Sequence, residues 1–171
     1  MAQMDDGYIF QLGNIFFNQK QIGYVSEEGL VAGGDAPSTT QVRAAQLANA
    51  VVKTLLTTPG VNRFTFTLIQ LLGENIKDVF GGTVDPATGD YTAPRVQAPL
   101  EGKLLIAAES GHKLIAQKVS LTANFANSVS LANTLAIACT LEILMPETGE
   151  PFKILTPAST LDISGYLPVE G

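Results

Sequence analysis

Three stretches of the chain alternate apolar and polar residues, and this alternation constrains the fold more than any other feature of the sequence. The longest is 113–125, where apolar positions such as Leu121 are flanked by polar ones such as Thr122. Successive side chains of a strand point to opposite faces, so the pattern predicts strands with one buried and one polar face. A Glu-Ser-Gly-His turn joins this stretch to a strand expected over 103–108 in a hairpin, and the segments 61–69 and 134–145 also alternate.

The segment 69–80 follows the period of a helix instead. Its apolar residues Ile69, Leu72, Ile76 and Val79 form one stripe when they are placed on a helix. The glycine pair that follows is a typical carboxyl-terminal stop, because glycine adopts the left-handed capping conformation without strain. The sequence therefore predicts one helix over 69–80.

The segment 41–58 allows two interpretations. Ala44, Leu47, Ala48 and Val51 recur at helical spacing, and alanine favours the helix. The sequence VVKTLLTT in its second half is rich in β-branched residues, which favour a strand. The pattern alone leaves both open.

Antiparallel strands around one helix indicate a mainly β (α+β) domain, with a sandwich or barrel of antiparallel sheets packed against the helix. A chain of 171 residues suits one domain, 1–171. Strands are also expected over 8–17 and 22–25. The segment 83–99, rich in Pro, Gly and Thr, is expected to be a loop.

Composition argues against two classes of partner. The net charge of -6 and pI of about 4.6 do not suit tight nucleic-acid binding, which depends on Lys and Arg neutralising phosphates. The apolar runs are far shorter than the roughly 20 residues of a membrane helix, so we expect no membrane association. The amino terminus is acidic without an apolar run, so we expect no signal peptide and a soluble protein.

The chain is poor in residues for catalysis or metal binding. His112 is the only histidine and is expected to be exposed in a turn, and Cys139 is expected to be a buried, unreactive thiol. One His and one Cys cannot build a common zinc site, and no phosphate-binding glycine loop is present. Glu27 and Glu28 are adjacent, so on a strand they would point to opposite faces. We therefore expect no enzyme, no cofactor and no metal.

The order of segments resembles that of a known family. The stretch IGYVSEEGL is followed by a Gly/Pro loop and then by QVRAAQLANAVVKTLLTTPGVNRFTFTLIQLLGENIKDVFGG. In this order the segments resemble the major tail proteins of long-tailed bacteriophages, especially phages of Gram-positive and actinobacterial hosts. The match is close over about 23–82, and the later hairpins match by pattern.

The resemblance implies a tail tube fold and a structural, self-assembling protein of the virion tail, made in the bacterial host cytoplasm. Sixfold rings of such subunits stack into the tube of a siphophage, through which DNA passes into the host. Its implied partners are further copies of the chain, a tape-measure protein, and tail tip and terminator proteins. The resemblance also implies that 31–57 is a loop or arm reaching a neighbouring subunit, against the helical interpretation of 41–58.

Within this framework two sets of residues become candidates. Glu27 and Glu28, at the end of a strand, are candidates for pairing with a basic residue of a neighbouring ring; otherwise they are ordinary surface carboxylates. The basic candidates are Arg43, Lys53 and Arg63. Reversing the charge of both glutamates is expected to impair tube assembly more than folding.

A second set concerns the lumen. Ser120, Thr122 and Asn124 are candidates for lining it, because neutral side chains do not hold passing phosphates; Lys118 on the same face is an exception. An ordinary solvated sheet face explains these residues equally well.

Three other functions remain open on the sequence. The chain resembles a tail tube subunit, but a tube component of a contractile injection machine or a head–tail completion protein of similar fold would carry comparable segments. A ligand-binding β-sandwich is the alternative from a different class. Aromatic side chains exposed for stacking on a ligand would favour that alternative.

Overall fold

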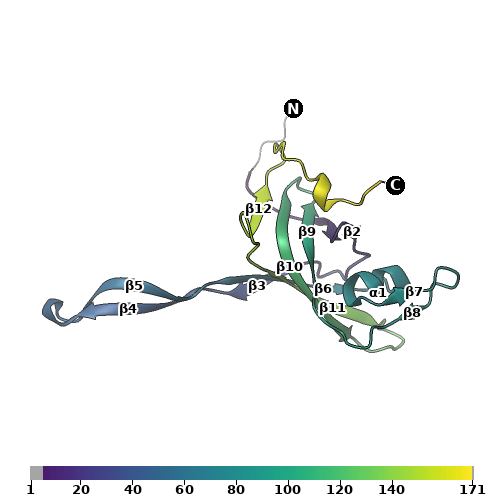
Figure 1. Ribbon diagram of the computed structural model, residues 1–171, viewed down its shortest axis with the longest axis horizontal. Coiled ribbons are helices and arrows are strands. Elements are labelled where there is room, and N and C mark those ends of the chain that lie inside the picture. Colours follow the sequence, from purple (N-terminus) through teal and green to yellow (C-terminus); the bar gives the residue numbers. More distant parts are fainter. Residues whose placement is uncertain (1–5, 171) are drawn as a thin grey trace.

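The computed structural model describes residues 6–170, and its main elements are antiparallel strands. The predicted mainly β, antiparallel architecture is confirmed. Figure 1 shows a body that contains one large sheet and the helix α1 (Gly73–Phe80), and a long hairpin that projects from it. We call this hairpin the arm; it consists of residues 38–58.

The body is built on one eight-stranded sheet, and residues 6–170 form two further sheets of two strands each. In sheet order its strands are β2 (Lys20–Gln21), β1 (Leu12–Phe17), β9 (Leu100–Ala108), β10 (Lys113–Ala126), β11 (Ala136–Ile143), β6 (Val61–Leu68) and β3 (Val31–Asp35), with β12 (Phe152–Leu155) paired to β10. The path is open, with β2 and β3 at its ends.

The core lies on one face of this sheet. It is formed by the apolar residues of the alternating strands together with the buried face of α1. The largest fully buried side chains in this core are Leu68, Leu104, Leu121, Ile137, Leu141, Val119 and Cys139, whereas Leu105, on the other face of β9, is buried outside this cluster. The alternation predicted the buried residues of β6 and β11 correctly, but in β10 Phe125 is exposed and a register shift after Ala116 leaves Ile115 outside the core cluster.

The helix is shorter than the sequence predicts. It begins at Gly73 instead of Ile69, and both Ile69 and Leu72 are exposed. The amide of Ile69 donates a hydrogen bond to the carbonyl of Tyr24 at 3.0 Å, so this part of the chain follows the 21–30 loop. At the other end Gly81 has a φ of 77° and its N–H bonds to the carbonyl of Lys77, which confirms the predicted stop.

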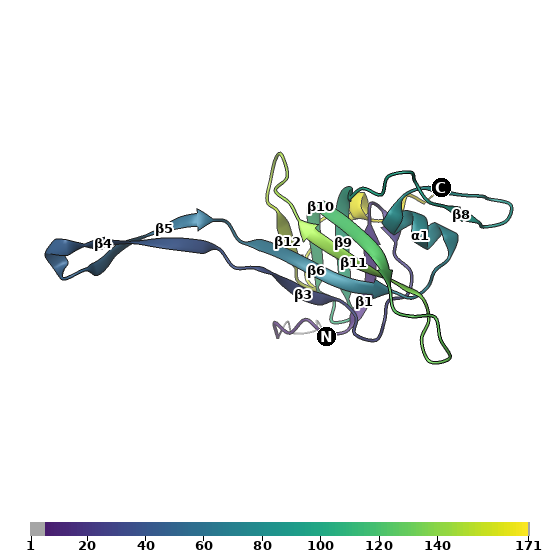
Figure 2. The ribbon, with the colours of Figure 1, turned by 90° about the horizontal axis from the view of Figure 1, so that it is seen from below.

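The helical interpretation of 41–58 is wrong. These residues form β4 (Ser38–Ala44) and β5 (Ala50–Thr58), joined by a short 3₁₀ turn at Ala45–Leu47 and two residues with positive φ, Ala48 and Asn49. The β-branched residues of β5 outweigh the helix-favouring alanines of 44–50, since cross-strand pairing with β4 is available only to the extended chain. Figures 1 and 2 show this arm extending away from the body.

The arm is joined to the body through an interruption in the strand ladder. The β3–β6 ladder ends at Asp35 and Val61, and the β4–β5 ladder begins at Ser38 and Thr58. Between them lie 36–37 and 59–60, which include two prolines that have no N–H to donate. We call these four residues the joint.

The amino-terminal strands are also shorter than expected. The strand predicted over 8–17 begins at Leu12, because Gln11 has a φ of 56° and the residues before it are exposed. The strand predicted over 22–25 is reduced to one bridge between Val25 and Leu68. Residues 1–5, where part of the acidic amino terminus lies, are outside the described range.

Two smaller predictions are corrected. His112 is buried, not exposed, and its Nδ1 lies 3.1 Å from Ser110 Oγ, because the β9–β10 turn folds back against the body. The segment 83–99, expected to be a loop, contains two short strands that pair with each other, β7 (Thr83–Val84) and β8 (Tyr91–Thr92). The Tyr91 hydroxyl donates to the carbonyl of Gly81 at 2.7 Å and so ties this hairpin to the end of α1.

Candidate assembly surfaces

A polar surface covers the sheet face opposite the core on β10, β11, β6 and β3. Thr122 of β10 pairs with Thr140 of β11, which in turn pairs with Thr65 of β6. Ser120 and Asn124 lie on either side of Thr122 on the same face, with Ser120 half-buried and Asn124 exposed. The structure thus brings the three lumen candidates together on one surface, which we call the polar face.

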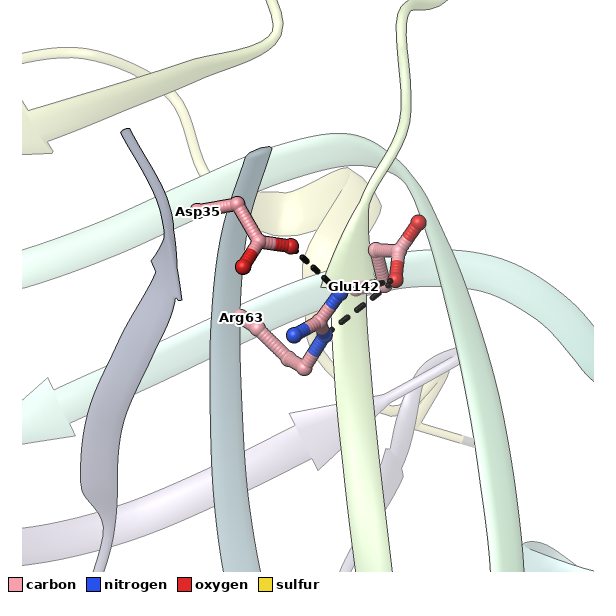
Figure 3. Close-up of polar contacts among 3 residues, drawn as sticks. All are labelled: Asp35, Arg63 and Glu142. Atoms are coloured by element: carbon pink, nitrogen blue, oxygen red, sulfur yellow. Dashed lines mark hydrogen bonds and ion pairs between the residues drawn. The ribbon is translucent and has the colours of Figure 1, made fainter. Parts of the chain in front are cut away.

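The acidic and basic groups of the polar face lie in pairs. Arg63 on β6 lies between Glu142 on β11 and Asp35 on β3, as Figure 3 shows. Its Nη2 is 3.2 Å from Glu142 Oε2 and 3.4 Å from Asp35 Oδ2. The hydrogen bonds to Glu142 raise the pKa of the Arg63 guanidinium above its ordinary value, and the charge of Asp35 adds to this. Arg63, a candidate for pairing between subunits, is therefore engaged within its own chain.

Lys118 is paired as well. Its Nζ lies 3.7 Å from Glu101 Oε2, and Glu101 is the register partner of Ser120. Lys118, which the sequence places on the same face as the lumen candidates, has a carboxylate beside it. Lys118 and Arg63 thus both have acidic partners on these strands, whereas Lys113, at the start of β10, forms no ion pair with a residue in the described range.

The arm exposes apolar side chains along its length. Its outward residues are Val42, Leu47, Val51, Val52, Leu55 and Leu56. No residue of 38–58 belongs to the core cluster. Exposed apolar surface on a two-stranded hairpin is unfavourable in water, and such hairpins are at best marginally stable alone. The arm therefore has the character of a segment that another surface covers.

The two basic candidates on the arm lie in different settings. Arg43 donates to the carbonyl of Asn49 at 3.1 Å and to Gln41 Oε1 at 2.8 Å, which braces the turn of the hairpin. Lys53 sits opposite Val42 in the ladder and is exposed. Neither forms an ion pair with a residue in the described range.

Glu27 and Glu28 lie in a turn, not at the end of a strand. Ser26 donates its N–H to the carbonyl of Thr67 at 2.8 Å, and Gly29 closes the turn with an N–H bond of 2.9 Å to Ser26. Both carboxylates are exposed. The structure does not bring them to Arg43, Lys53 or Arg63 of the same chain.

The residues considered for chemistry are placed as follows. Cys139 is buried in the core, and burial raises the pKa of its thiol to about 12, as the sequence predicts for an unreactive cysteine. Among residues 6–170 no three His, Cys, Asp or Glu side chains gather as a metal site would require. Over the same range no helix has the length and apolar character needed to cross a bilayer.

Sequence reasoning missed the acidic partners on the polar face. Glu142 could have been found, since it alternates with the buried Leu141 and so lies on the polar side of β11. Asp35 and Glu101 carry no such signal, because their place beside Arg63 and Lys118 depends on which strands are neighbours.

Comparison with known proteins adds no identification. No protein-family model matches the chain, and no curated protein matches it.

Proposed function

We propose that this chain is a structural virion protein that assembles into sixfold rings, stacked as the tail tube of a long-tailed, non-contractile bacteriophage. The observation that carries the proposal is the polar face, on which Arg63 and Lys118 are paired with carboxylates of the same subunit. Double-stranded DNA is a dense polyanion, and each unpaired Lys or Arg on a channel wall would release counterions and retain the passing strand. A wall of Thr, Ser and Asn with neutralised cations offers DNA little to bind.

The ends of the sheet also support assembly. Every residue of β3 and both residues of β2 are exposed, so the sheet ends in strands with unpaired main-chain groups. Such edges pair readily with other chains unless they are covered. In a ring, the neighbouring subunits would cover them, and the sheets together would line a channel.

The arm supplies a second contact between subunits. Its apolar side chains are solvent-exposed in the single chain, and burying them against a neighbour removes them from water. In the proposed tube each arm reaches a subunit beyond its own ring position. Attachment to the tape-measure, tail tip and terminator proteins belongs to the same proposal.

Electron microscopy of the concentrated, purified protein tests the proposal. We expect negatively stained rings or tubes of uniform bore, with sixfold symmetry in end views. A particle that stays monomeric at every concentration in light scattering, and that forms no ring when mixed with a tail-tip preparation, would contradict it. Filaments without a central channel would also contradict it, since the polar face would then line nothing.

A further inference from the structure

An open groove lies on the body between the amino-terminal segment 9–15 and the 21–30 loop. Its volume is about 910 Å³. Its lining is mixed, with about as much polar as apolar surface, and Ile15, Ile22 and Ile106 at its floor are buried. Ile9, Phe10 and Tyr24 also line the groove, and all three are exposed. The groove thus presents three exposed apolar side chains beside polar groups.

Amide side chains line the same groove. Gln21 donates to Asn14 Oδ1 at 2.8 Å, and Asn75 donates to the carbonyl of Gln70 at 3.1 Å. Each primary amide offers two N–H donors and an oxygen with two lone pairs, so these bonds use only part of their capacity. The remaining donors and acceptors match the unpaired main-chain groups along the outer edges of a β-hairpin.

The groove carries charge of one sign. Among residues 6–170, Glu27 and Glu28 are the only charged ones that line it. The arm carries charge of the opposite sign, because Arg43 and Lys53 are the only charged residues of 38–58. The hairpin extends away from the body in both views of Figures 1 and 2, so it does not reach the groove of its own chain.

We propose that this groove seats the arm of a second copy of the chain. The apolar residues of the arm cover the floor and the aromatic side chains, the amides bond its edge, and Glu27 and Glu28 pair with Arg43 and Lys53. The inference rests on the proposed self-assembly, for which it names the acceptor surface, but it does not depend on the tubular form. It accounts together for two exposed apolar surfaces that neither charge nor packing explains within one chain.

A charge-swap experiment tests the pairing. Glu27→Lys/Glu28→Lys and Arg43→Glu/Lys53→Glu each place like charges in contact, and we expect each to raise the concentration needed for assembly at least about tenfold. The variant with all four changes restores opposite charges and should assemble within about threefold of the wild type. All four positions are exposed and outside the core, so their thermal unfolding should match that of the wild type.

The matched control is Glu147→Lys/Glu150→Lys, which makes the same change in net charge in an exposed loop away from the groove. It should leave assembly unchanged. If it weakens assembly as much as reversal at Glu27 and Glu28, net charge explains the result and the pairing is wrong. The pairing is also wrong if the fourfold variant stays as defective as the two doubles.

Cysteine cross-linking tests the contact directly, in a background where the native Cys139 is buried and unreactive. Two differently tagged chains, one with Glu28→Cys and one with Lys53→Cys, are mixed and oxidised. We expect a disulfide-linked heterodimer that the control pair Glu147→Cys with Lys53→Cys does not form. Native mass spectrometry counts the linked chains.

The outcomes separate this inference from the proposed function. Uniform tubes without the 28–53 link, or with a fourfold variant that is not rescued, overturn the groove assignment and leave the tube standing. The link together with rescue, in an assembly that has no bore, supports the groove and overturns the tube. A chain that is monomeric and unlinked at every concentration overturns both.

Discussion

Arg63 Nη2 lies 3.2 Å from Glu142 Oε2 and 3.4 Å from Asp35 Oδ2, so one guanidinium joins β11, β6 and β3 on the polar face. A guanidinium can bond to two carboxylates at once because its donors form a planar fork, which an ammonium group lacks. Arg63 therefore holds the edge strand that leads into the arm while its charge is neutralised. This relationship links the polar face to the arm.

Freeing the cations of the polar face should create DNA affinity. In Glu101→Gln/Glu142→Gln, Lys118 loses its carboxylate partner and Arg63 keeps only the contact to Asp35, without loss of side-chain volume. We expect retention of DNA at low salt, with the slope of log affinity against log salt steepened by about 0.9 for each new phosphate contact. Filter binding over a salt series measures this.

The control for that experiment is Glu147→Gln/Glu170→Gln, which removes the same negative charge at two exposed residues that form no ion pair in the described range. It should bind DNA no better than the wild type. Equal binding by both double variants would show that overall charge, and not the pairing on the polar face, keeps DNA away.

Removing the arm should abolish assembly and spare folding. Replacing 37–59 by Asn-Gly closes β3 and β6 with a short hairpin turn, since Asp35 and Val61 are already paired. No core residue is lost, so the thermal unfolding midpoint should stay close to that of the wild type. Calorimetry and light scattering test the two halves of this prediction, and an armless chain that still polymerises would refute it.

Leu141 should be among the positions most sensitive to truncation. Its side chain is fully buried on the core face of β11, and Leu141→Ala leaves a cavity that rigid neighbours cannot fill. We expect a loss of about 2–5 kcal/mol in the free energy of unfolding, measured by urea denaturation. Thr140→Ala, on the opposite face of the same strand, is the control and should cost far less.

Asp78 should make the protein relatively more stable at mildly acidic pH. Burial raises the pKa of this carboxyl above 3.8, and Lys20, with its Nζ 3.2 Å from Asp78 Oδ1, only partly opposes the shift. The folded state therefore binds the proton more tightly than the unfolded state, and stability at this site falls as pH rises through the folded pKa.

Comparison with Asp78→Asn isolates this effect, because the asparagine does not titrate. The free energy of unfolding of the wild type minus that of the variant should increase as pH falls from neutrality toward 4. Urea denaturation at a series of pH values gives this difference. A difference that stays constant or decreases on acidification would contradict the assignment.

Cys139 should resist thiol reagents until the protein unfolds. Its pKa of about 12 leaves almost no thiolate at pH 8, and the core excludes the reagent. We expect labelling by a chromogenic disulfide to be slow in buffer and complete within minutes in urea. Fast labelling of the native chain would mean that β11 opens readily.

The sequence predicts those parts of the fold that depend on neighbours along the chain. Alternation identified the buried face of β11 and of the middle of β10, and the glycines after Phe80 identified the end of α1. What it missed depends on contacts between distant segments. The bond from Ile69 to Tyr24 delays the start of the helix, and the fold of the β9–β10 turn buries His112.

The same distinction between local patterns and contacts of distant segments applies to the candidate surfaces. Ser120, Thr122 and Asn124 share a face because of the period of a strand, which is local. The roles of Arg63 and Lys118 depend on strand order, so their carboxylate partners could not be named in advance. For 41–58, the spacing of alanines favoured a helix. The segment forms two strands instead, because β4 and β5 pair with each other.

The joint has a mechanical consequence. Pro37 and Pro59 leave the ladder open between the arm and the sheet, so a force on the arm bends the backbone there before it strains the hydrogen bonds of β3 and β6. A filament of such subunits would flex at its connections while each wall segment kept its shape. Stiffness and compliance then reside in different parts of one polypeptide.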